Sequence, residues 1–528
     1  MKKMFILTHF LFMCFGIYAH QASFFNFEMI KYHGCLMASE EPNEMIVLES
    51  GLLEGETVRL SIASSEGFVT IDLGDGTVLE KEVSTDVNVP TFMQFNSPVT
   101  QPTITIVGNI TGIDCSSLKL SGLNCSLAKS LMVLKCDINM LSSLDVSQNY
   151  NLVRLYCNDN AIEELHLGDS SALKLLYCHE NKISDLNLDN SGNLIELSCY
   201  RNQLKTLDIA SCPNLVILNV SKNKLGKIDL SKNNLLEQLY CEGCNLDDLE
   251  VSANPNLSIL YCGDNSLTSL DVSNLYKLLE LNCKINEITD LNLSNNGELE
   301  ELYCFTNKLI SLDISSLLSL NTLSCGDNNL TSLDVRNNKQ LVSLSCSYNN
   351  ISDLQISGNT SIALIACDHN LLDRLLADGC ENLKLIMADH NNLSVEGTDE
   401  LIESLTMRNE GEDEGMIIFH NEEEDPSEDL NVCAIDAPDR ALSKRWYMLN
   451  GEDMLPLGIG DVCLEAFSES SKLSIPSFMD KWYIYDMKGS LVGKGSMSGV
   501  NLNVLHKGTY VLLYYIDGIA KEVKFYNK

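Results

Sequence analysis

The sequence predicts a solenoid of short parallel strands on a concave face, with little helix and a small β domain at each end. Three observations predict this fold. The chain repeats one pattern every 21 residues, and leucine and cysteine alternate with other residues inside each repeat. With 528 residues, the chain is also too long for one compact core unless repetition extends that core.

The repeat runs without an insertion through the predicted solenoid, residues 108–395. A typical unit is Leu257–Lys277, LSILYCGDNSLTSLDVSNLYK, and its pattern is L-x-x-L-x-C-x-x-N-x-L-x-x-L-D-V-S. We number the places of each unit from its first residue. The units begin at Ile110, Leu131, Leu152, Leu173, Leu194, Leu215, Leu236, Leu257, Leu278, Leu299, Leu320, Leu341, Ile362 and Leu383.

Places 3 to 7 predict a strand. Leu260 and Cys262 point to one side, whereas Ile259 and Tyr261 point to the other. One such strand cannot bury its apolar side alone, so successive strands are expected to stack in parallel and to share one core.

Polar residues at fixed places predict how each coil turns. Asparagine occupies place 9 in twelve units, Asn160 and Asn328 among them, where its amide is expected to bond backbone groups that no sheet reaches. Asp271–Ser273 is expected to turn the chain on the convex side.

Twelve cysteines share place 6. Such a column has two interpretations, a redox or metal site and a row of small buried apolar residues. Val220 and Ala388 occupy the same place and have no thiol chemistry, and a column spreads ligands along a line. The sequence therefore favours structural core and no metal site. The column comprises Cys115, Cys136, Cys157, Cys178, Cys199, Cys241, Cys262, Cys283, Cys304, Cys325, Cys346 and Cys367.

These residues resemble leucine-rich repeats, defined by L-x-x-L-x-L-x-x-N-x-L, with Cys at place 6. Units of 21 residues with a cysteine column are similar to those of the internalin J-like bacterial surface proteins. The resemblance covers roughly residues 104–410 and implies a curved solenoid with an adhesive or host-contacting role.

The N-terminus has the order of a signal peptide, predicted at residues 1–19. Lys2 and Lys3 precede an apolar stretch, and Ala19 is a suitable cleavage residue. A single membrane anchor is the alternative. No later segment is apolar for long enough to cross a bilayer. The mature chain is therefore expected to have no transmembrane segment.

Residues 45–107 alternate in short runs bounded by glycine and polar residues, which predicts a small β-sandwich-like domain. The segment Ile71–Thr77 is similar to the F-G-D-G-T turn of polycystic-kidney-disease-like domains. Asp75 and Gly76 indicate a hairpin turn, with a calcium site as the alternative.

Residues 396–450 are expected to cap the solenoid. They contain a predicted helix with Thr398 as N-cap and short strands at Met416–Phe419 and Arg445–Met448. The acidic stretches at 410–414 and 422–429 are interpreted as solvated loops, with calcium binding as the alternative.

Residues 462–528 form a second predicted β-sandwich-like domain. Tyr485–Gly489, Lys507–Val511 and Lys524-Phe525 resemble the sorting domain of the type IX secretion system of Bacteroidetes, although the usual Pro-Asn-Pro opening is reduced to Ile475-Pro476. The resemblance implies a secreted protein on the outer-membrane surface or outside the cell.

The outward places 3, 5 and 7 are where a partner would bind, because tyrosine is a frequent interface anchor. The alternative is that these aromatic side chains stack on each other and merely shield the sheet. A protein ligand is the first expectation and a glycan, or a scaffolding role, the second. The predicted binding residues are Arg154, Tyr156, Tyr177, His179, Glu196, Tyr200, Tyr240, Tyr261, Glu280, Glu301, Tyr303 and Phe305.

A formal net charge of −37 argues against nucleic acid and anionic lipid as partners. The scattered histidines form no nucleophile–base constellation, so no enzyme and no cofactor are expected. Two His–Asp pairs are an exception to this scatter, because Asp368-His369 and Asp389-His390 lie one period apart and are expected to be neighbours. A weak metal site there is the alternative to none. We expect a monomer.

Overall fold

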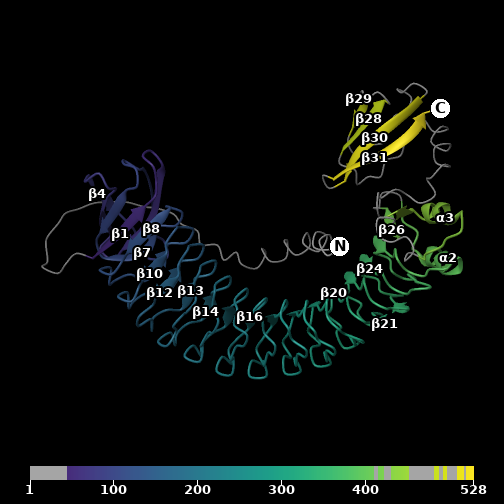
Figure 1. The fold of residues 1–528 in the computed structure, drawn as a ribbon, viewed down its shortest axis with the longest axis horizontal. Coiled ribbons are helices and arrows are strands. Elements are labelled where there is room, and N and C mark those ends of the chain that lie inside the picture. The colour runs from purple at the N-terminus through teal and green to yellow at the C-terminus, as the bar shows by residue number, and fades with distance from the viewer. Residues whose placement is uncertain are drawn as a thin grey trace. The chain divides into compact units, whose positions relative to one another are not determined.

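The computed structural model describes residues 44–409, 414–420 and 430–450, and the backbone of four strands between residues 481 and 527 (Figure 1). The predicted signal peptide and most of the two acidic stretches lie outside the described residues. The chain divides into two compact units, Met1–Leu246 and Asp247–Lys528, which we describe separately as unit 1 and unit 2.

Unit 1 begins with antiparallel strands. One sheet has the order β4-β3-β6-β1-β8, and β2 pairs with both β5 and β7. These strands are β1 (Met45–Ser50), β2 (Thr57–Ser64), β3 (Phe68–Asp72), β4 (Val78–Glu82), β5 (Thr91–Asn96), β6 (Thr103–Val107), β7 (Ile110–Asp114) and β8 (Leu120–Asn124). Because β7 also pairs in parallel with β9, the first coil of the repeat belongs to both arrangements.

The remaining strands of unit 1 lie in the coils. The main strands pair in parallel, and each residue lies opposite the equivalent residue of the next coil, as in Arg154 opposite Leu175 and Tyr156 opposite Tyr177. They are β9 (Val133–Lys135), β11 (Arg154–Tyr156), β13 (Leu175–Tyr177), β14 (Glu196–Ser198), β15 (Ile217–Asn219) and β16 (Gln238–Tyr240). On the other side of the coils, β10 (Ser143–Asp145) and β12 (Glu164–His166) form a second short parallel pair.

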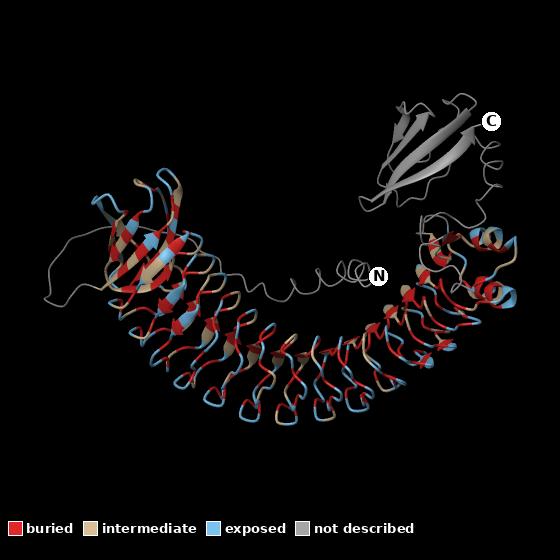
Figure 2. Cartoon of the chain, viewed as in Figure 1, coloured by how far each residue is buried: buried red, intermediate tan, exposed pale blue. Residues whose placement is uncertain are grey.

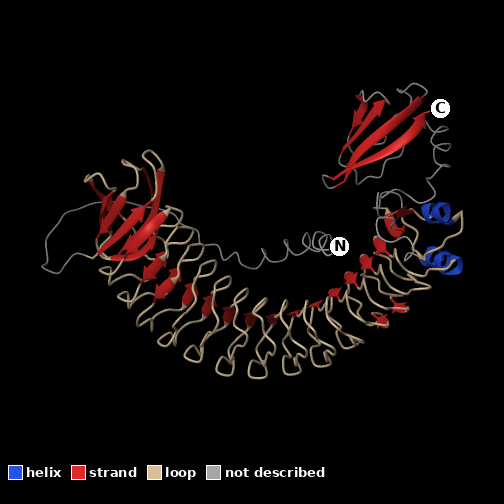
Figure 3. Ribbon diagram, viewed as in Figure 1, coloured by secondary structure: helices blue, strands red, loops and turns tan. Residues whose placement is uncertain are grey.

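Unit 2 has the same construction. Its main strands are β17 (Ile259–Tyr261), β18 (Glu280–Asn282), β19 (Glu301–Tyr303), β20 (Thr322–Ser324), β22 (Ser343–Ser345), β24 (Leu364–Ala366), β25 (Leu385–Met387), β26 (Gly415–His420) and β27 (Trp446–Asn450). A second short pair is β21 (Ser332–Asp334) with β23 (Asp353–Gln355). The predicted parallel-β solenoid with little helix is thus confirmed, and Figure 3 shows how much of each coil is loop.

Unit 2 also contains the two helices of the described residues, α2 (Val395–Ser404) and α3 (Ala437–Ser443). The expectation that Thr398 caps the helix is wrong. Ser394 is the N-cap, because its Oγ accepts the N–H of Gly397 at 3.0 Å directly after the last repeated leucine. Thr398 lies inside the helix, fully buried, and its hydroxyl donates to the carbonyl of Val432.

Four C-terminal strands form an antiparallel sheet in the order β29-β28-β30-β31. They are β28 (Lys481–Asp486), β29 (Leu491–Gly495), β30 (Gly508–Ile516) and β31 (Ile519–Asn527).

The core of each coil consists of the leucine places and place 6. Leu260 and Cys262 are fully buried, whereas Ile259 and Tyr261 are partly exposed, as the alternation predicts. In Figure 2 buried and exposed segments alternate around each coil. All twelve cysteines of place 6 are buried, so the structural interpretation of the column agrees with their environment.

Place 9 forms a hydrogen-bonded ladder. Asn160 Nδ2 donates to the carbonyls of Cys136, at 3.0 Å, and of Cys157, at 3.2 Å, and its Oδ1 accepts the N–H of Leu141 at 3.0 Å. Asn328 repeats these contacts in unit 2. Each asparagine therefore joins its own coil to the preceding one, as expected.

A second asparagine column, at place 19, forms hydrogen bonds with backbone carbonyls of the preceding coil. Asn149 Nδ2 donates to the carbonyls of Cys125 and Ala128, and Asn296 Nδ2 donates to those of Val272 and Leu275. The sequence alone does not distinguish this column, since serine, cysteine and leucine share its place in other units.

Place 8 adopts a left-handed backbone in successive coils of both units, with φ between 51° and 57°. This conformation ends the strand while the backbone N–H still donates to the next coil, as Ile285 does to the carbonyl of Phe305. The left-handed residues are Ile138, Asp159, Glu180, Arg201 and Lys222 in unit 1 and Asp264, Ile285, Thr306, Asp327, Tyr348, His369 and His390 in unit 2.

Candidate functional site

The predicted binding residues are all partly exposed on the outward face of the main strands. This follows from the alternation, because places 4 and 6 point into the core and places 3, 5 and 7 point away from it. We call this surface the sheet face of each unit. Unit 1 carries Arg154, Tyr156, Tyr177, His179, Glu196, Tyr200 and Tyr240, and unit 2 carries Tyr261, Glu280, Glu301, Tyr303 and Phe305.

On unit 1, four rings from three consecutive coils contact each other in a row. The ring centroids of Tyr156 and Tyr177 are 5.0 Å apart, and those of Tyr177 and His179 are 6.2 Å apart. His179 stacks on Tyr200 with a centroid distance of 4.3 Å and an interplanar angle of 10°. We call Tyr156, Tyr177, His179 and Tyr200 the aromatic row.

The aromatic row is held by polar neighbours. Burial, together with a hydrogen bond to Glu196, raises the pKa of Tyr177, so its phenol is protonated at neutral pH. Burial lowers the pKa of His179, and the Oγ of Ser198 lies 3.2 Å from its Nδ1. The row is therefore neutral at physiological pH and its side chains are fixed in place by their neighbours.

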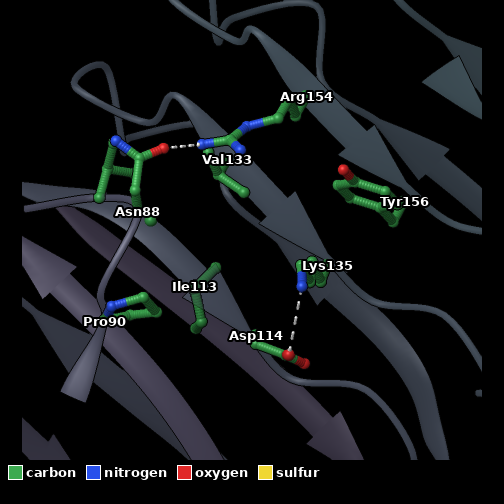
Figure 4. A pocket seen from close by; sticks show the side chains of 10 residues that line it. Asn88, Pro90, Ile113, Asp114, Val133, Lys135, Arg154 and Tyr156 are labelled. Carbon is green, nitrogen blue, oxygen red and sulfur yellow. Dashed lines mark hydrogen bonds and ion pairs between the residues drawn. The ribbon is translucent and has the colours of Figure 1, made fainter. Parts of the chain in front are cut away.

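Beside the aromatic row, a small cavity of about 40 Å³ lies between β7, β9, β11 and the 87–90 segment (Figure 4). Two of its lining residues bond each other, since Arg154 Nη2 donates to Asn88 Oδ1 at 2.6 Å. Lys135 Nζ lies 5.3 Å from the centre of the Tyr156 ring and 4.0 Å from Asp114 Oδ2. Asn88 was not predicted because it comes from outside the repeat. Asp114 and Lys135 were not predicted because they occupy the outward place 5 without being aromatic.

The sheet face of unit 2 is organised by tyrosine–glutamate pairs. Tyr261 donates its phenol proton to Glu280 Oε2 at 2.6 Å, and Tyr303 donates to Glu301 Oε2 at 2.7 Å. Phe305 lies under Lys284, whose Nζ is 6.0 Å from the ring centre. These six residues come from three consecutive coils.

Tyr240 lies two coils beyond Tyr200 in unit 1. Its phenol donates to Gln238 Oε1 on its own strand at 3.2 Å. Between Tyr177 and Tyr240, Ser198 and Asn219 occupy place 5.

Unit 2 also contains a cluster at places 7 and 8 that was not among the predicted binding residues. We call Asp368, His369, Asp389 and His390 the His–Asp cluster. The two imidazole rings stack at 4.1 Å with an interplanar angle of 7°, and Tyr348 stacks on His369 at 3.9 Å. Burial and the nearby charge of Asp368 raise the pKa of Asp389.

Thiols of the cysteine column have raised pKa values. Burial raises the pKa of Cys178, Cys283 and Cys325 to about 12, so these thiols stay protonated at neutral pH. A protonated thiol is a poor nucleophile and a poor metal ligand. The column thus contributes packing.

Within the described residues, helices are too short and too polar to cross a bilayer.

Comparison with solved structures identifies the fold as a leucine-rich-repeat solenoid. The functional domain of InlJ from Listeria monocytogenes, which includes a cysteine ladder, has 20% sequence identity and a TM-score of 0.51, covering 82% of this chain and 94% of that one. A leucine-rich-repeat protein of Leptospira interrogans has 23% identity and a TM-score of 0.46, covering 53% of this chain and 83% of that one. The effector YopM of Yersinia pestis has 24% identity and a TM-score of 0.46, covering 54% of this chain and 78% of that one. The sequence matches no protein-family model and no curated protein.

Proposed function

We propose that this chain is a secreted cell-surface protein that binds a protein ligand on its sheet face, as an internalin-like adhesin, and has no catalytic role. The aromatic row of unit 1 is the observation that carries this proposal. Its four rings are partly exposed, come from three consecutive coils and are already ordered by contacts with each other.

Ordered aromatic side chains favour binding because little conformational entropy remains to be lost when a partner packs against them. Tyrosine also offers an apolar ring and a polar tip to the same partner. Beside the row, Arg154 and Lys135 supply cations, while Glu196 supplies a carboxylate. The net charge of −37 favours a partner that is neutral or basic.

The proposed location rests on both ends of the chain. Residues 1–19 have the order of an export signal, and residues 462–528 resemble a type IX sorting domain of Bacteroidetes. The antiparallel strands β28 to β31 occur in that region, which is compatible with the resemblance. In a bacterium with this secretion system, removal of residues 462–528 should leave the protein in the periplasm, as cell fractionation would show. Unchanged surface display would contradict the sorting role.

The binding proposal is tested with paired tyrosine variants. Tyr177→Ala with Tyr261→Ala removes one ring from the sheet face of each unit. The matched control, Tyr150→Ala with Tyr276→Ala, removes two tyrosines of place 20, which are 50% and 57% exposed and lie in turns outside the main strands. Loss of one anchor of about 2 kcal/mol weakens binding about 30-fold.

The assay is attachment of the purified full chain to host cells. We expect attachment to fall in the sheet-face variant but not in the control, with circular dichroism unchanged in both. Protease treatment of the cells should abolish attachment if the ligand is a protein, whereas glycosidase treatment should abolish it if the ligand is a glycan. Equal attachment of both variants would remove the sheet face from the proposal.

A further inference from the structure

We propose that His369, Asp389 and His390 form a binding site for a divalent transition-metal ion of the zinc class. One nitrogen of each histidine and one carboxylate oxygen of Asp389 lie within 4.8 Å of one another. All three residues belong to two adjacent coils of unit 2, so the repeat itself brings them together.

Hydrogen bonds orient both imidazole rings for this role. The Nδ1 of His369 is 3.1 Å from Asp368 Oδ2, and the Nδ1 of His390 is 3.2 Å from Asp389 Oδ2. A carboxylate accepts, so each Nδ1 carries the proton and the lone pair of each ring lies on Nε2. Asp389 lies on the Nδ1 side of His390, so it gives up this hydrogen bond when it binds an ion held at Nε2. At His369, whose carboxylate partner Asp368 is not a proposed ligand, this arrangement is the usual support of a histidine that binds metal through its other nitrogen.

A second observation, the buried Nε2 atom of His390, also indicates a bound ligand. The residue is 3% exposed, and its Nε2 is buried without a hydrogen-bond partner. Buried polar atoms are nearly always satisfied, because an unpaired one costs free energy. A metal ion bound at this nitrogen would satisfy it.

The ligand set selects the kind of ion. Two imidazoles and one carboxylate suit zinc and its neighbours, whereas calcium and magnesium prefer oxygen ligands throughout. Metal–ligand bonds of about 2.0–2.1 Å place ligand atoms about 3.4 Å apart in a tetrahedron, so the cluster must contract from its present spacing. The stacked rings can tilt about their side-chain bonds to do so. The His369 side chain is 15% exposed, which gives an ion from solvent access to the cluster.

The same stacking occurs without these features elsewhere in the chain. His179 stacks on Tyr200 at 4.3 Å, but its Nδ1 faces the hydroxyl of Ser198 and no second histidine is in the stack. Stacking alone therefore does not define a site, and His179 provides a matched control.

The experiment titrates the full chain, freed of metal and kept reduced with a non-chelating reductant, with Zn²⁺ by calorimetry and with Co²⁺ by absorption. We expect one ion per chain and a Co²⁺ spectrum without the sulfur charge-transfer band that cysteine ligation would give. His369→Asn with His390→Asn should abolish this binding, and His179→Asn should leave it unchanged. Asparagine is chosen because it tolerates the left-handed backbone of place 8.

A third variant tests the supporting carboxylate. Asp368 is not a metal ligand in this arrangement, but it orients His369. The variant Asp368→Asn should therefore weaken Zn²⁺ binding about 10- to 100-fold. Failure of the wild-type chain to bind Zn²⁺, a sulfur band, or unchanged binding in the double variant would each overturn the proposal. If the double variant does not fold, imidazole nitrogen shifts of the wild-type chain decide, because Zn²⁺ must move the Nε2 signals of His369 and His390 and leave His179 unaffected.

Discussion

Replacing Asn181 by alanine should destabilise the chain strongly, although the residue is small and binds no partner molecule. Its Nδ2 donates to the carbonyls of Cys157, Cys178 and His179, at 2.9, 3.1 and 3.1 Å. Its Oδ1 accepts the N–H of Ile162 at 2.9 Å in a fully buried position. The variant removes all four bonds at once.

The magnitude follows from what each partner retains. Cys157 O keeps Asn160, Cys178 O keeps Asn202 and the third carbonyl keeps a backbone donor, so these losses cost about 0.5 kcal/mol each. The amide of Ile162 is left buried and unpaired, which costs about 1–3 kcal/mol. We therefore expect the free energy of unfolding to fall by about 3–4 kcal/mol.

Urea denaturation, followed by circular dichroism, measures this loss, and hydrogen exchange of the Ile162 amide reports it locally. The control is Asn193→Ala in the same coil, whose exposed amide donates to Ser171 O at 2.7 Å and should matter by less than about 0.5 kcal/mol. If Asn181→Ala unfolds within about 0.5 kcal/mol of the wild type at an unchanged slope, the place 9 ladder does not stabilise the coils as argued.

Two further predictions concern other columns. Burial raises the pKa of Cys178 and Cys283 to about 12, so alkylation of these thiols in the native chain should be slow and should not follow the rise in rate with pH that an ordinary thiol shows. Mass spectrometry after timed labelling checks this, and rapid native labelling would contradict the burial of the column. Ile285 is a β-branched residue at φ 53°, so Ile285→Asn should raise the free energy of unfolding by about 1 kcal/mol. The control Ile310→Asn, at a 66% exposed position outside the left-handed set, should change it little, and equal effects would refute the strain argument.

The sequence predicts the coil geometry well because the length of the unit never varies. A constant period fixes the parallel register, as in Leu281 opposite Leu302, and a polar residue at one place within apolar neighbours identifies the place 9 ladder. Place 19 is harder to interpret, since asparagine alternates there with residues that have no amide. The left-handed backbone of place 8 is equally hidden, because Ile285 and Thr306 disfavour that conformation.

For the candidate site, the alternation predicts which side chains face outward but not which hydrogen-bond partners they have. Tyr261 reaches forward to Glu280 in the next coil, whereas Tyr303 bonds Glu301 in its own strand, although both tyrosines occupy place 5. Such choices depend on side-chain rotamers, which the repeat does not determine. The cavity beside Arg154 needs Asn88, a residue without any place in the period.

The place 9 ladder joins only adjacent coils, and that has a consequence for how such a chain can change in length. Within unit 2, Asn349 bonds the carbonyls of Cys325 and Cys346, and Asn370 bonds those of Cys346 and Cys367. Excision or duplication of exactly one period would create a junction chemically identical to the ones it replaced. Genetic gain or loss of whole periods is therefore structurally neutral at the seam, whereas a single inserted residue would misalign every bond across it.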